Sequence, residues 1–303
     1  MKARLARGLV FCWLLLVLGA LFVGGGSIPT YASTLTQFRT SAMGTVRQYF
    51  VPFDDAHLWQ LFVGKDQCHY QNTGATPQQP LVSYIFLTAG SDNTVYYYDH
   101  WEDGYDIDPL DPGAMTEIGV LDAGVTKLFQ SDIYTAQLGT TFYYDGRDRI
   151  TLLGEDGAVV RMVYPKYAKA SGGSGTSLAA AWEVPGVTEW GTQYVATVGE
   201  DLDFNGPGIK ADDHDYAGLE VMAEQPNTQV YYNNVLVATL GTGETFFIAG
   251  ANDGPGGGGI DSDDVITATA PIQVQVMTGG CNYDYSAHGY TLQPMEVWAQ
   301  EYW

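Results

Sequence analysis

The chain has 303 residues, of which 13 are lysine or arginine and 35 are aspartate or glutamate, so its formal net charge is −22. A surface this acidic repels phosphate backbones, which disfavours a nucleic-acid partner. The length suffices for one large or two ordinary domains. Glycine and tyrosine are frequent and no long amphipathic helical pattern occurs, so the composition predicts a globular, mostly β protein.

Residues 1–32 have the pattern of a signal peptide. A basic start is followed by an apolar run over 9–23 and by small residues at the cleavage position, 30–32. The run is short for a transmembrane helix, although an uncleaved membrane anchor is the alternative. Residues 1–32 carry three cations and no anion, so cleavage takes the formal charge from −22 to −25. We therefore expect an extracellular or cell-surface protein that meets the membrane only through this signal.

Two cysteines, Cys68 and Cys281, lie outside the signal. In an oxidising compartment such a pair predicts a disulfide, which here would join the start of the mature chain to its end. Two separate buried thiols are the alternative, and a metal site of Cys68 with His69 is a weaker one.

Two stretches of the mature chain match each other segment by segment. The matched segments alternate polar and apolar residues as half-buried strands do, and Asn233-Asn234 predicts a two-residue hairpin turn. In chain order the matches are 84–89 with 219–223, 93–97 with 227–232, 121–129 with 240–247, 148–151 with 264–267, and 158–164 with 272–277. The pattern predicts an all-β chain of tandem antiparallel β-sandwich domains, with matched strands in equivalent places.

A second repeated element frames these domains. The Pro-x-x-x-x-Trp-x-x-x-Tyr opening that contains Trp190 recurs, one residue shorter, around Trp298. We therefore expect the two tryptophans to be equivalent, and the chain to be the N-terminal part of a longer polypeptide. The predicted organisation is a signal peptide (1–32), a segment packing on the first sandwich (33–79), the first sandwich (80–168), a small, polar linker (169–182), the second sandwich (183–293) and the start of a truncated third unit (294–303).

Residues 201–212 have the spacing of a calcium loop. Oxygen ligands stand at Asp201, Asp203 and Asn205, Gly206 follows, and Asp212 closes the loop at position twelve. The usual closing residue is a bidentate glutamate, and no paired helices flank the loop. We therefore expect calcium to be bound between strands and not in an EF-hand. An acidic, solvated turn is the alternative.

A second acidic segment, 98–111, combines carboxylates with aromatic rings. It is interpreted first as an acidic loop or cation site, then as a sugar-binding loop in which Trp101 or Tyr105 stacks on a sugar, and last as a pair of catalytic carboxylates. Adjacent Glu102 and Asp103 point apart on an extended chain, so they cannot form such a pair. The candidates are Asp99, Trp101, Glu102, Asp103, Tyr105, Asp106 and Asp108, and a weaker cation candidate is the group Asp261, Asp263 and Asp264.

No zinc-ligand spacing of histidines and no Gly-x-Ser-x-Gly pattern occurs, so the residues predict no enzyme. The Trp190-Gly-x-x-Tyr-Val opening, the Asn-Thr-x-Val strand and the Leu-x-x-Gly-x-x-x-x-Phe strand resemble the N-terminal domain of IgG-Fc-binding proteins. The segment Tyr98-Asp-His-Trp-Glu-Asp-Gly-Tyr105 resembles large bacterial surface proteins with repeated β-sandwich modules. Both resemblances, over about residues 80–303, imply an extracellular adhesion or binding module without catalysis, and they do not imply immunoglobulin binding.

Together these observations predict a secreted or cell-surface, calcium-stabilised adhesion or structural module. Its partner would be a surface glycan or a protein of a host or neighbouring cell. The alternative is a secreted carbohydrate-binding or carbohydrate-active protein that uses the loop 98–111.

Overall fold

The computed structural model describes residues 46–69, 80–108, 112–154, 157–166, 179–202, 214, 216–250, 259–279 and 287–298, with only the backbone for 63–69 and Thr135. The predicted signal peptide and Cys281 lie outside these residues, as does the side chain of Cys68, so the disulfide stays a prediction. Within the described residues, no helix has the length and apolar character needed to cross a membrane.

The described chain is mostly antiparallel β-sheet, as the composition and periodicity predicted. Its strands are β1 (Val46–Phe50), β2 (Leu81–Ala89), β3 (Thr94–Asp99), β4 (Glu117–Leu121), β5 (Thr126–Ile133), β6 (Arg149–Leu153), β7 (Gly157–Pro165), β8 (Ala180–Val184), β9 (Gly191–Val195), β10 (Tyr216–Ala223), β11 (Thr228–Tyr232), β12 (Val235–Leu240), β13 (Thr245–Ala249), β14 (Val265–Gly279) and β15 (His288–Thr291). An α-helix, α3 (Asp55–His69), and the short 3-10 helices η1 (Thr135–Gln137), η2 (Val187–Glu189), η3 (Glu200–Leu202) and η5 (Met295–Val297) complete it.

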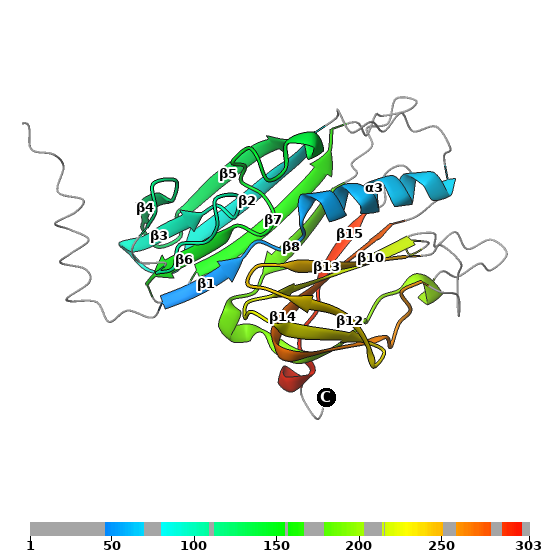
Figure 1. Cartoon of the computed structure of the whole chain (residues 1–303). Helices are drawn as coiled ribbons and strands as arrows, with labels where there is room; N and C mark the ends of the chain where they lie inside the picture. The colour runs from blue at the N-terminus through cyan, green and yellow to red at the C-terminus, as the bar shows by residue number, and fades with distance from the viewer. Residues whose placement is uncertain are drawn as a thin grey trace, which may run out of the picture. The chain divides into compact units, whose positions relative to one another are not determined.

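The first half, β1 to β8, forms two four-stranded antiparallel sheets (Figure 1). Their strand orders are β1-β6-β3-β4 and β5-β2-β7-β8. A shared core contains buried side chains of both sheets, among them Tyr98 and Ile150 of the first and Ile85 and Phe129 of the second. The two sheets therefore face each other across this core.

The second half, β9 to β15, forms one seven-stranded antiparallel sheet. The path runs β12-β11-β14-β10-β13, and β9 and β15 also pair with β14. The long strand β14 pairs through its first part with β9 and β11 and through its second part with β10 and β15. Strands β12 and β13, the two ends of the path, also contact each other, so this sheet is barrel-like and nearly closed.

Segments that match in sequence also pair in the same way. β2 pairs with β5 and β7, and β10 pairs with β13 and the second part of β14. β3 pairs with β4 and β6, and β11 pairs with β12 and the first part of β14. The two halves differ at β6 and β7, which are separate strands in separate sheets of the first half. In the second half the single strand β14 takes the places of both, so the strands there form one sheet.

The turns repeat as well. Asn93 and Asn227 hold positive φ angles of 58° and 62°, a backbone region that asparagine tolerates better than most residues. Gly124 and Gly243 hold φ angles of 75° and 66°, and their N–H groups donate to the carbonyls that end β2 and β10 at 2.8 Å in both halves. Matching residues therefore form matching turns between the equivalent strands of the two halves.

Trp190 and Trp298 have equivalent local structure. Each follows a 3-10 helix, and each indole N–H donates to a carbonyl five residues earlier, that of Pro185 or Gln293, at 3.2 Å. Trp190 is buried against Phe50, whereas Trp298 is 39% exposed. The local repeat therefore extends to the end of the described chain, while the surroundings of its two copies differ.

Helix α3 was not predicted. It begins where the Asp54 carboxylate accepts the N–H of Ala56 at 2.8 Å, which satisfies a free donor of the first turn. Leu58, Leu61 and Phe62 form a buried stripe at helical spacing. The helix contacts β10 of the second half (Figure 1), whereas β1, which precedes it, pairs with β6 of the first.

The two halves share an apolar core around α3. It joins Phe53 and the α3 stripe to Trp182 of β8, Tyr216 of β10 and Met277 of β14. Trp182 is fully buried and its indole N–H donates to the carbonyl of Val276 at 3.1 Å. Strands β8 and β15 also meet, where the Thr291 hydroxyl donates to the Glu183 carbonyl at 2.7 Å. Apolar burial therefore ties the first half to the second.

We expect Trp182→Phe to lower the free energy of unfolding by about 1–3 kcal/mol, because it removes the indole donor from Val276 and leaves part of a packed site empty. Trp298→Phe is the matched control, since its indole is partly exposed, and should change stability by no more than about 0.5 kcal/mol. Urea denaturation followed by circular dichroism measures both. Equal losses would contradict the role given to this core.

Candidate metal centre

The turn 145–148, which precedes β6, is closed by its own last residue. The Asp148 carboxylate accepts the N–H of Asp145 at 3.0 Å and the hydroxyl of Tyr98 at 2.6 Å. It also accepts the N–H of Trp101 at 3.3 Å. Arg147 holds a positive φ of 78°, and its N–H donates to the Val51 carbonyl at 2.8 Å.

The second half contains the same arrangement before the first part of β14. The Asp264 carboxylate accepts the N–H of Asp261 at 2.8 Å and the hydroxyl of Tyr232. Asp263 holds a positive φ of 73°, and its N–H donates to the Ala196 carbonyl at 2.9 Å. An aspartate bound by a tyrosine and by its own turn is therefore part of the repeated architecture.

The first half adds further groups to this aspartate. Donor atoms of His100, Glu102 and Asp148 all lie within 4.8 Å of one another. His100 Nδ1 is 3.4 Å from Asp148 Oδ2, and Glu102 accepts the N–H of Tyr143 at 3.2 Å. Asp145 lies beside them and accepts the indole N–H of Trp101 at 3.1 Å. We call His100, Glu102, Asp145 and Asp148 the acidic centre.

Two buried carboxylate oxygens of the acidic centre, Glu102 Oε2 and Asp145 Oδ2, have no hydrogen-bond partner, and His100 Nδ1 has the 3.4 Å ion pair with Asp148. Asp145 is 1% exposed and His100 is 7% exposed. Buried polar atoms are normally satisfied by protein, water or an ion, because leaving one unpaired costs about 1–3 kcal/mol. The acidic centre therefore has free donor capacity that faces away from bulk solvent.

The acidic centre contains three acidic groups and one basic group. Burial, followed by repulsion from Asp148, raises the pKa of Glu102 to about 7. Burial and the charges of Asp148 and Asp55 raise the pKa of Asp145 well above its ordinary value. Burial lowers the pKa of His100, but Asp148 and Glu102 together outweigh that effect and raise it. The folded protein therefore favours uptake of a proton or a cation here.

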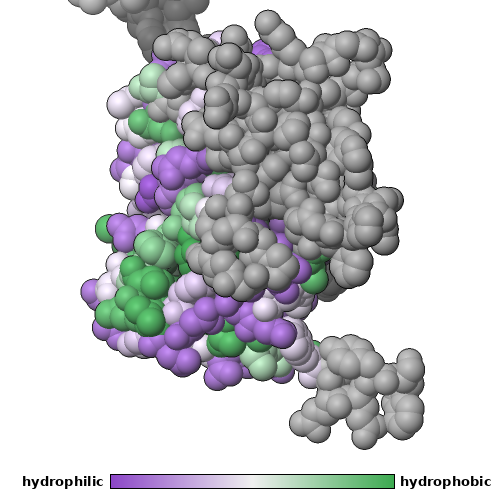
Figure 2. Space-filling view, turned by 90° about the vertical axis from the view of Figure 1, so that its right-hand side faces the viewer, coloured by the Kyte–Doolittle hydropathy of each residue, from purple (hydrophilic) through white to green (hydrophobic). Residues whose placement is uncertain are grey.

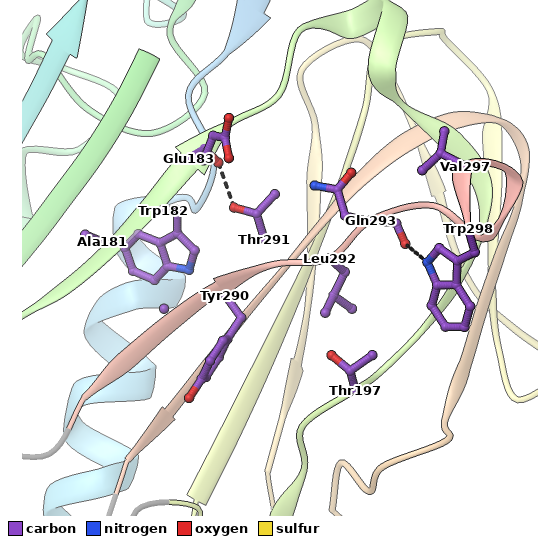
Figure 3. A pocket seen from close by; sticks show the side chains of 11 residues that line it. Ala181, Trp182, Glu183, Thr197, Tyr290, Thr291, Leu292, Gln293, Val297 and Trp298 are labelled. Atoms are coloured by element: carbon purple, nitrogen blue, oxygen red, sulfur yellow. Dashed lines mark hydrogen bonds between the residues drawn. The ribbon is translucent and has the colours of Figure 1, made fainter. Parts of the chain in front are cut away.

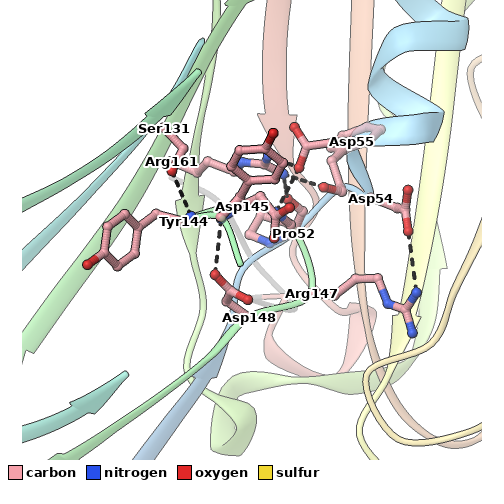
Figure 4. Close-up of polar contacts among 12 residues, drawn as sticks. Pro52, Asp54, Asp55, Ser131, Tyr144, Asp145, Arg147, Asp148 and Arg161 are labelled. Atoms are coloured by element: carbon pink, nitrogen blue, oxygen red, sulfur yellow. Dashed lines mark hydrogen bonds and ion pairs between the residues drawn. The ribbon is translucent and has the colours of Figure 1, made fainter. Parts of the chain in front are cut away.

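Arg161, a buried cation whose charge acts on Asp145, is already bound (Figure 4). Its guanidinium lies 2.6 Å from Asp55 Oδ2 and donates to the carbonyls of Pro52 and Phe53. The same Asp55 oxygen accepts the N–H of Gly146 at 2.8 Å. The Arg161 guanidinium is therefore the counter-ion of Asp55 and does not bind the carboxylates of the acidic centre.

Of the candidates predicted in the segment 98–111, Glu102 enters the acidic centre. Asp99 pairs with Arg149 at 2.5 Å, and Asp106 accepts the Gly113 N–H at 2.8 Å and the Thr116 hydroxyl at 2.7 Å. Both carboxylates therefore serve to fold the loop. Asp103 and Asp108 are exposed, and Asp111 lies outside the described residues.

The two aromatic candidates of this segment have covered faces. The Arg147 guanidinium lies 4.1 Å from the ring centroid of Trp101. Tyr105 packs edge-on against Phe50 with centroids 5.4 Å apart, and the Arg149 guanidinium lies 5.2 Å from its centroid. Its hydroxyl donates to the Arg147 carbonyl at 2.6 Å. These contacts hold the loop against the body of the first half.

The predicted calcium loop 201–212 is described only at its start. The Asp201 carboxylate accepts the N–H of Ser262 at 2.6 Å. Asp203, Asn205 and Asp212 lie outside the described residues, so convergence of these ligands on one point stays a prediction.

Sequence reasoning missed His100, Asp145 and Asp148 as site residues. Asp148 was recognised only as the first residue of the segment 148–151, which matches the segment 264–267 that begins at Asp264. The shared Asp-x-x-Asp spacing, Asp145 to Asp148 and Asp261 to Asp264, was the available signal. It indicates a turn closed by its second aspartate, but not which side chains gather around it.

A second buried polar group joins α3 to β10. Glu220 is 2% exposed and accepts the N–H of Asp54 at 2.9 Å, and His57 Nδ1 lies 2.7 Å from its other oxygen. Burial is the main cause that raises the pKa of Glu220 to about 7, and the interaction with His57 opposes it. The pKa of His57 is also raised, because Glu220 and Asp54 outweigh the effect of burial.

An open hollow of about 830 Å³ lies between β8, β15 and η5 (Figure 3). Tyr290, Leu292 and Trp298 supply apolar surface, and Glu183 and Gln293 supply polar groups. It contains none of the candidates predicted from the sequence.

Comparison with protein-family models, with curated proteins and with solved structures finds no match to this chain. The site is therefore interpreted from its own geometry.

The raised pKa of Glu220 predicts a pH dependence of stability. The folded-state pKa of about 7 exceeds the ordinary value of 4.5, so the folded state binds more protons between these values and stability falls as the pH rises through them. His57 acts in the same direction above its ordinary pKa of 6.5. We expect Glu220→Gln to reduce the loss of stability between about pH 5 and about pH 8, measured by urea denaturation. An unchanged slope would place the proton uptake at other groups, of which Glu102 is the first to test by Glu102→Gln.

Proposed function

We propose that this chain is a secreted or cell-surface module of two repeated antiparallel β units with an adhesive or structural role, and that it forms part of a longer bacterial surface protein. The signal-peptide pattern of residues 1–32 supports an extracellular location. The resemblance to bacterial surface proteins with repeated β-sandwich modules supports the same role.

The observation that carries the proposal is the repeated strand pairing joined by one apolar core. Equivalent strands, turns and aspartate-closed loops occur in both halves. Trp182 and the α3 stripe bury surface of both halves together. An apolar interface of this kind restricts the motion of the two halves relative to each other. A stiff, repeated spacer suits a stalk or an adhesin.

The surface offers places for a partner to bind. Val235, Leu236 and Val297 are exposed apolar side chains, and Figure 2 shows apolar residues grouped beside polar ones on one face. Exposed apolar groups rimmed by polar residues are typical of surfaces that contact other proteins.

Carbohydrate binding is the second candidate function, and the hollow between β8 and β15 favours it more than the loop 98–111 does. Trp298 is 39% exposed at the edge of that hollow, so its ring has a free area on which a sugar can stack. The rings of Trp101 and Tyr105 are covered by Arg147 and Arg149.

Export tests the proposal directly. We expect an epitope-tagged full chain in a bacterial host to reach the cell surface or medium with its N-terminus at Ser33. Leu16→Arg places a charge in the apolar run of the signal and should retain the protein inside the cell. N-terminal sequencing and protease accessibility on intact cells measure both. Intracellular wild-type protein with an intact N-terminus would contradict the proposal.

A glycan array separates the two candidate functions. Binding to a glycan that Trp298→Ala abolishes and Trp101→Ala retains would establish the carbohydrate function at the hollow. Attachment to cells or proteins without glycan binding would establish the adhesive one.

Calcium bound by the loop 201–212 is part of the proposed function. A cation that binds only the folded form stabilises it by about 2.7 kcal/mol at a concentration 100-fold above its dissociation constant. Extracellular calcium modules bind at about 10⁻⁴–10⁻³ M, so millimolar calcium would supply part of that stabilisation. We expect EGTA to lower the melting temperature of the exported chain.

The matched variants locate this effect. Asp203→Asn should remove most of the calcium response, and Asp108→Asn should leave it intact. A melting temperature that calcium and EGTA leave unchanged would identify the loop as an acidic turn.

A further inference from the structure

The acidic centre has the donor spacing of a metal site. Bonds of about 2.1 Å from a tetrahedral zinc ion place neighbouring ligand atoms about 3.4 Å apart. His100 Nδ1 and Asp148 Oδ2 already lie 3.4 Å apart. The Glu102 donor is within 4.8 Å of both, so a small movement of this partly buried side chain completes a three-residue set.

The unpartnered atoms of the acidic centre point to a ligand independently of this spacing. Glu102 Oε2 is buried without a hydrogen-bond partner, and His100 Nδ1 has only its 3.4 Å ion pair with Asp148. Asp145 is 1% exposed, and its Oδ2 is also unpartnered while its Oδ1 accepts the Trp101 indole N–H. A cation would bind His100 Nδ1 and Glu102 Oε2 directly, and Asp145, which lies outside this three-residue group, would bind a water on the ion.

Charge balance favours a cation over a neutral ligand. Three carboxylates, those of Glu102, Asp145 and Asp148, face one imidazole, and the guanidinium of Arg161 is bound to Asp55. A divalent ion converts the repulsion among these carboxylates into attraction.

The repeat shows that these extra groups are not needed to close the turn. In the second half, the Asp264 carboxylate meets the Tyr232 hydroxyl, the Asn233 amide and the Asp261 N–H. Among the described residues, a three-residue group with metal-ligand spacing forms around Asp148 and none forms around Asp264. His100 and Glu102 therefore add a capacity that the shared architecture lacks.

We propose that His100, Glu102 and Asp148, assisted by Asp145, bind a divalent first-row transition-metal ion that stabilises the first half. A donor set of one imidazole nitrogen with carboxylate oxygens suits zinc and its neighbours, whereas calcium takes six to eight oxygen ligands. This site is separate from the predicted calcium loop, and it does not depend on the proposed function.

Zinc binding to the purified chain tests the proposal. The chain is stripped with EDTA, dialysed at about pH 7.5, where a histidine ligand loses its proton readily, and titrated with zinc in a calorimeter. Cobalt is the second probe, because its visible absorption reports ligation by protein groups. We expect one zinc ion to bind per chain, with an affinity that requires His100, and we expect zinc to raise the melting temperature. Zinc should also displace bound cobalt and abolish its visible absorption.

Two variants and one control identify the ligands. His100→Asn and Glu102→Gln should each weaken zinc binding at least about tenfold. Asp132→Asn, the control, removes a carboxylate of β5 that pairs with Lys166 and should leave zinc affinity unchanged. The cobalt spectrum is recorded on each variant whose circular dichroism matches that of the wild type. Glu102 is only partly buried, so Glu102→Gln keeps the test usable if His100→Asn does not fold.

Three results would overturn the proposal. Zinc that binds His100→Asn and Glu102→Gln as tightly as the wild type would place the ion elsewhere. The absence of any zinc or cobalt binding would assign His100 the role of a protonated counter-charge for the carboxylates. Zinc binding lost through Asp203→Asn but retained by both acidic-centre variants would assign the metal to the loop 201–212. None of these results bears on export or adhesion.

Discussion

The buried ion pair of Arg161 and Asp55 is the contact on which much of this arrangement depends. Arg161 stands on β7 with no exposed surface, and its guanidinium binds Asp55 and the carbonyls of Pro52 and Phe53. Asp55 in turn binds the Gly146 N–H. A side chain at 146 would place its Cβ 1.7 Å from the Phe53 carbonyl oxygen, so only glycine fits there. Removing one partner of such a pair costs about 3–5 kcal/mol, because a charge is left buried and unpaired.

This ion pair positions both polar sites. It fixes the start of α3 against β7, so the α3 stripe meets Trp182 and Met277 and joins the two halves. It places Asp54 where its N–H reaches Glu220 of β10. It also holds the turn 145–148, which brings Asp145 and Asp148 to the loop that carries His100 and Glu102. The apolar core between the two halves and the acidic centre therefore depend on the same buried ion pair.

The two halves show how one β architecture can differ in its chemistry. In both halves a tyrosine hydroxyl binds the aspartate that closes a turn, and this turn precedes β6 in the first half and β14 in the second. In the second half the chain turns back immediately at Asn233 and Asn234, which form a tight hairpin. In the first half a long excursion follows β3 and supplies His100 and Glu102. Among the carboxylates of that excursion, Glu102 lies beside the buried Asp148, whereas Asp103 and Asp108 are exposed.

The sequence by itself determined the features that depend on near neighbours in the chain. Alternating polar and apolar residues, turn asparagines such as Asn93 and Asn227, and the order of matched segments all belong to short stretches, so the β class, the antiparallel strands and the repeated pairing could be predicted. Helix α3 escaped prediction because its apolar stripe is short, although Asp54 is a recognisable cap. The ligands of the loop 201–212 and the pairing of Cys68 with Cys281 remain predictions.

Only the tertiary structure decided which polar groups meet. Trp101 and Asp148 are 47 residues apart in the chain, and Arg161 and Asp55 are 106 residues apart, so no local pattern relates them. The fold also decided which partners the acidic segment has, since Asp99 pairs with Arg149 of β6 and Asp106 binds within the loop, while Glu102 lies beside His100. The physical reason is that burial and charge pairing are set by contacts across sheets, whereas periodicity in the sequence reports only which face of a single strand each residue occupies.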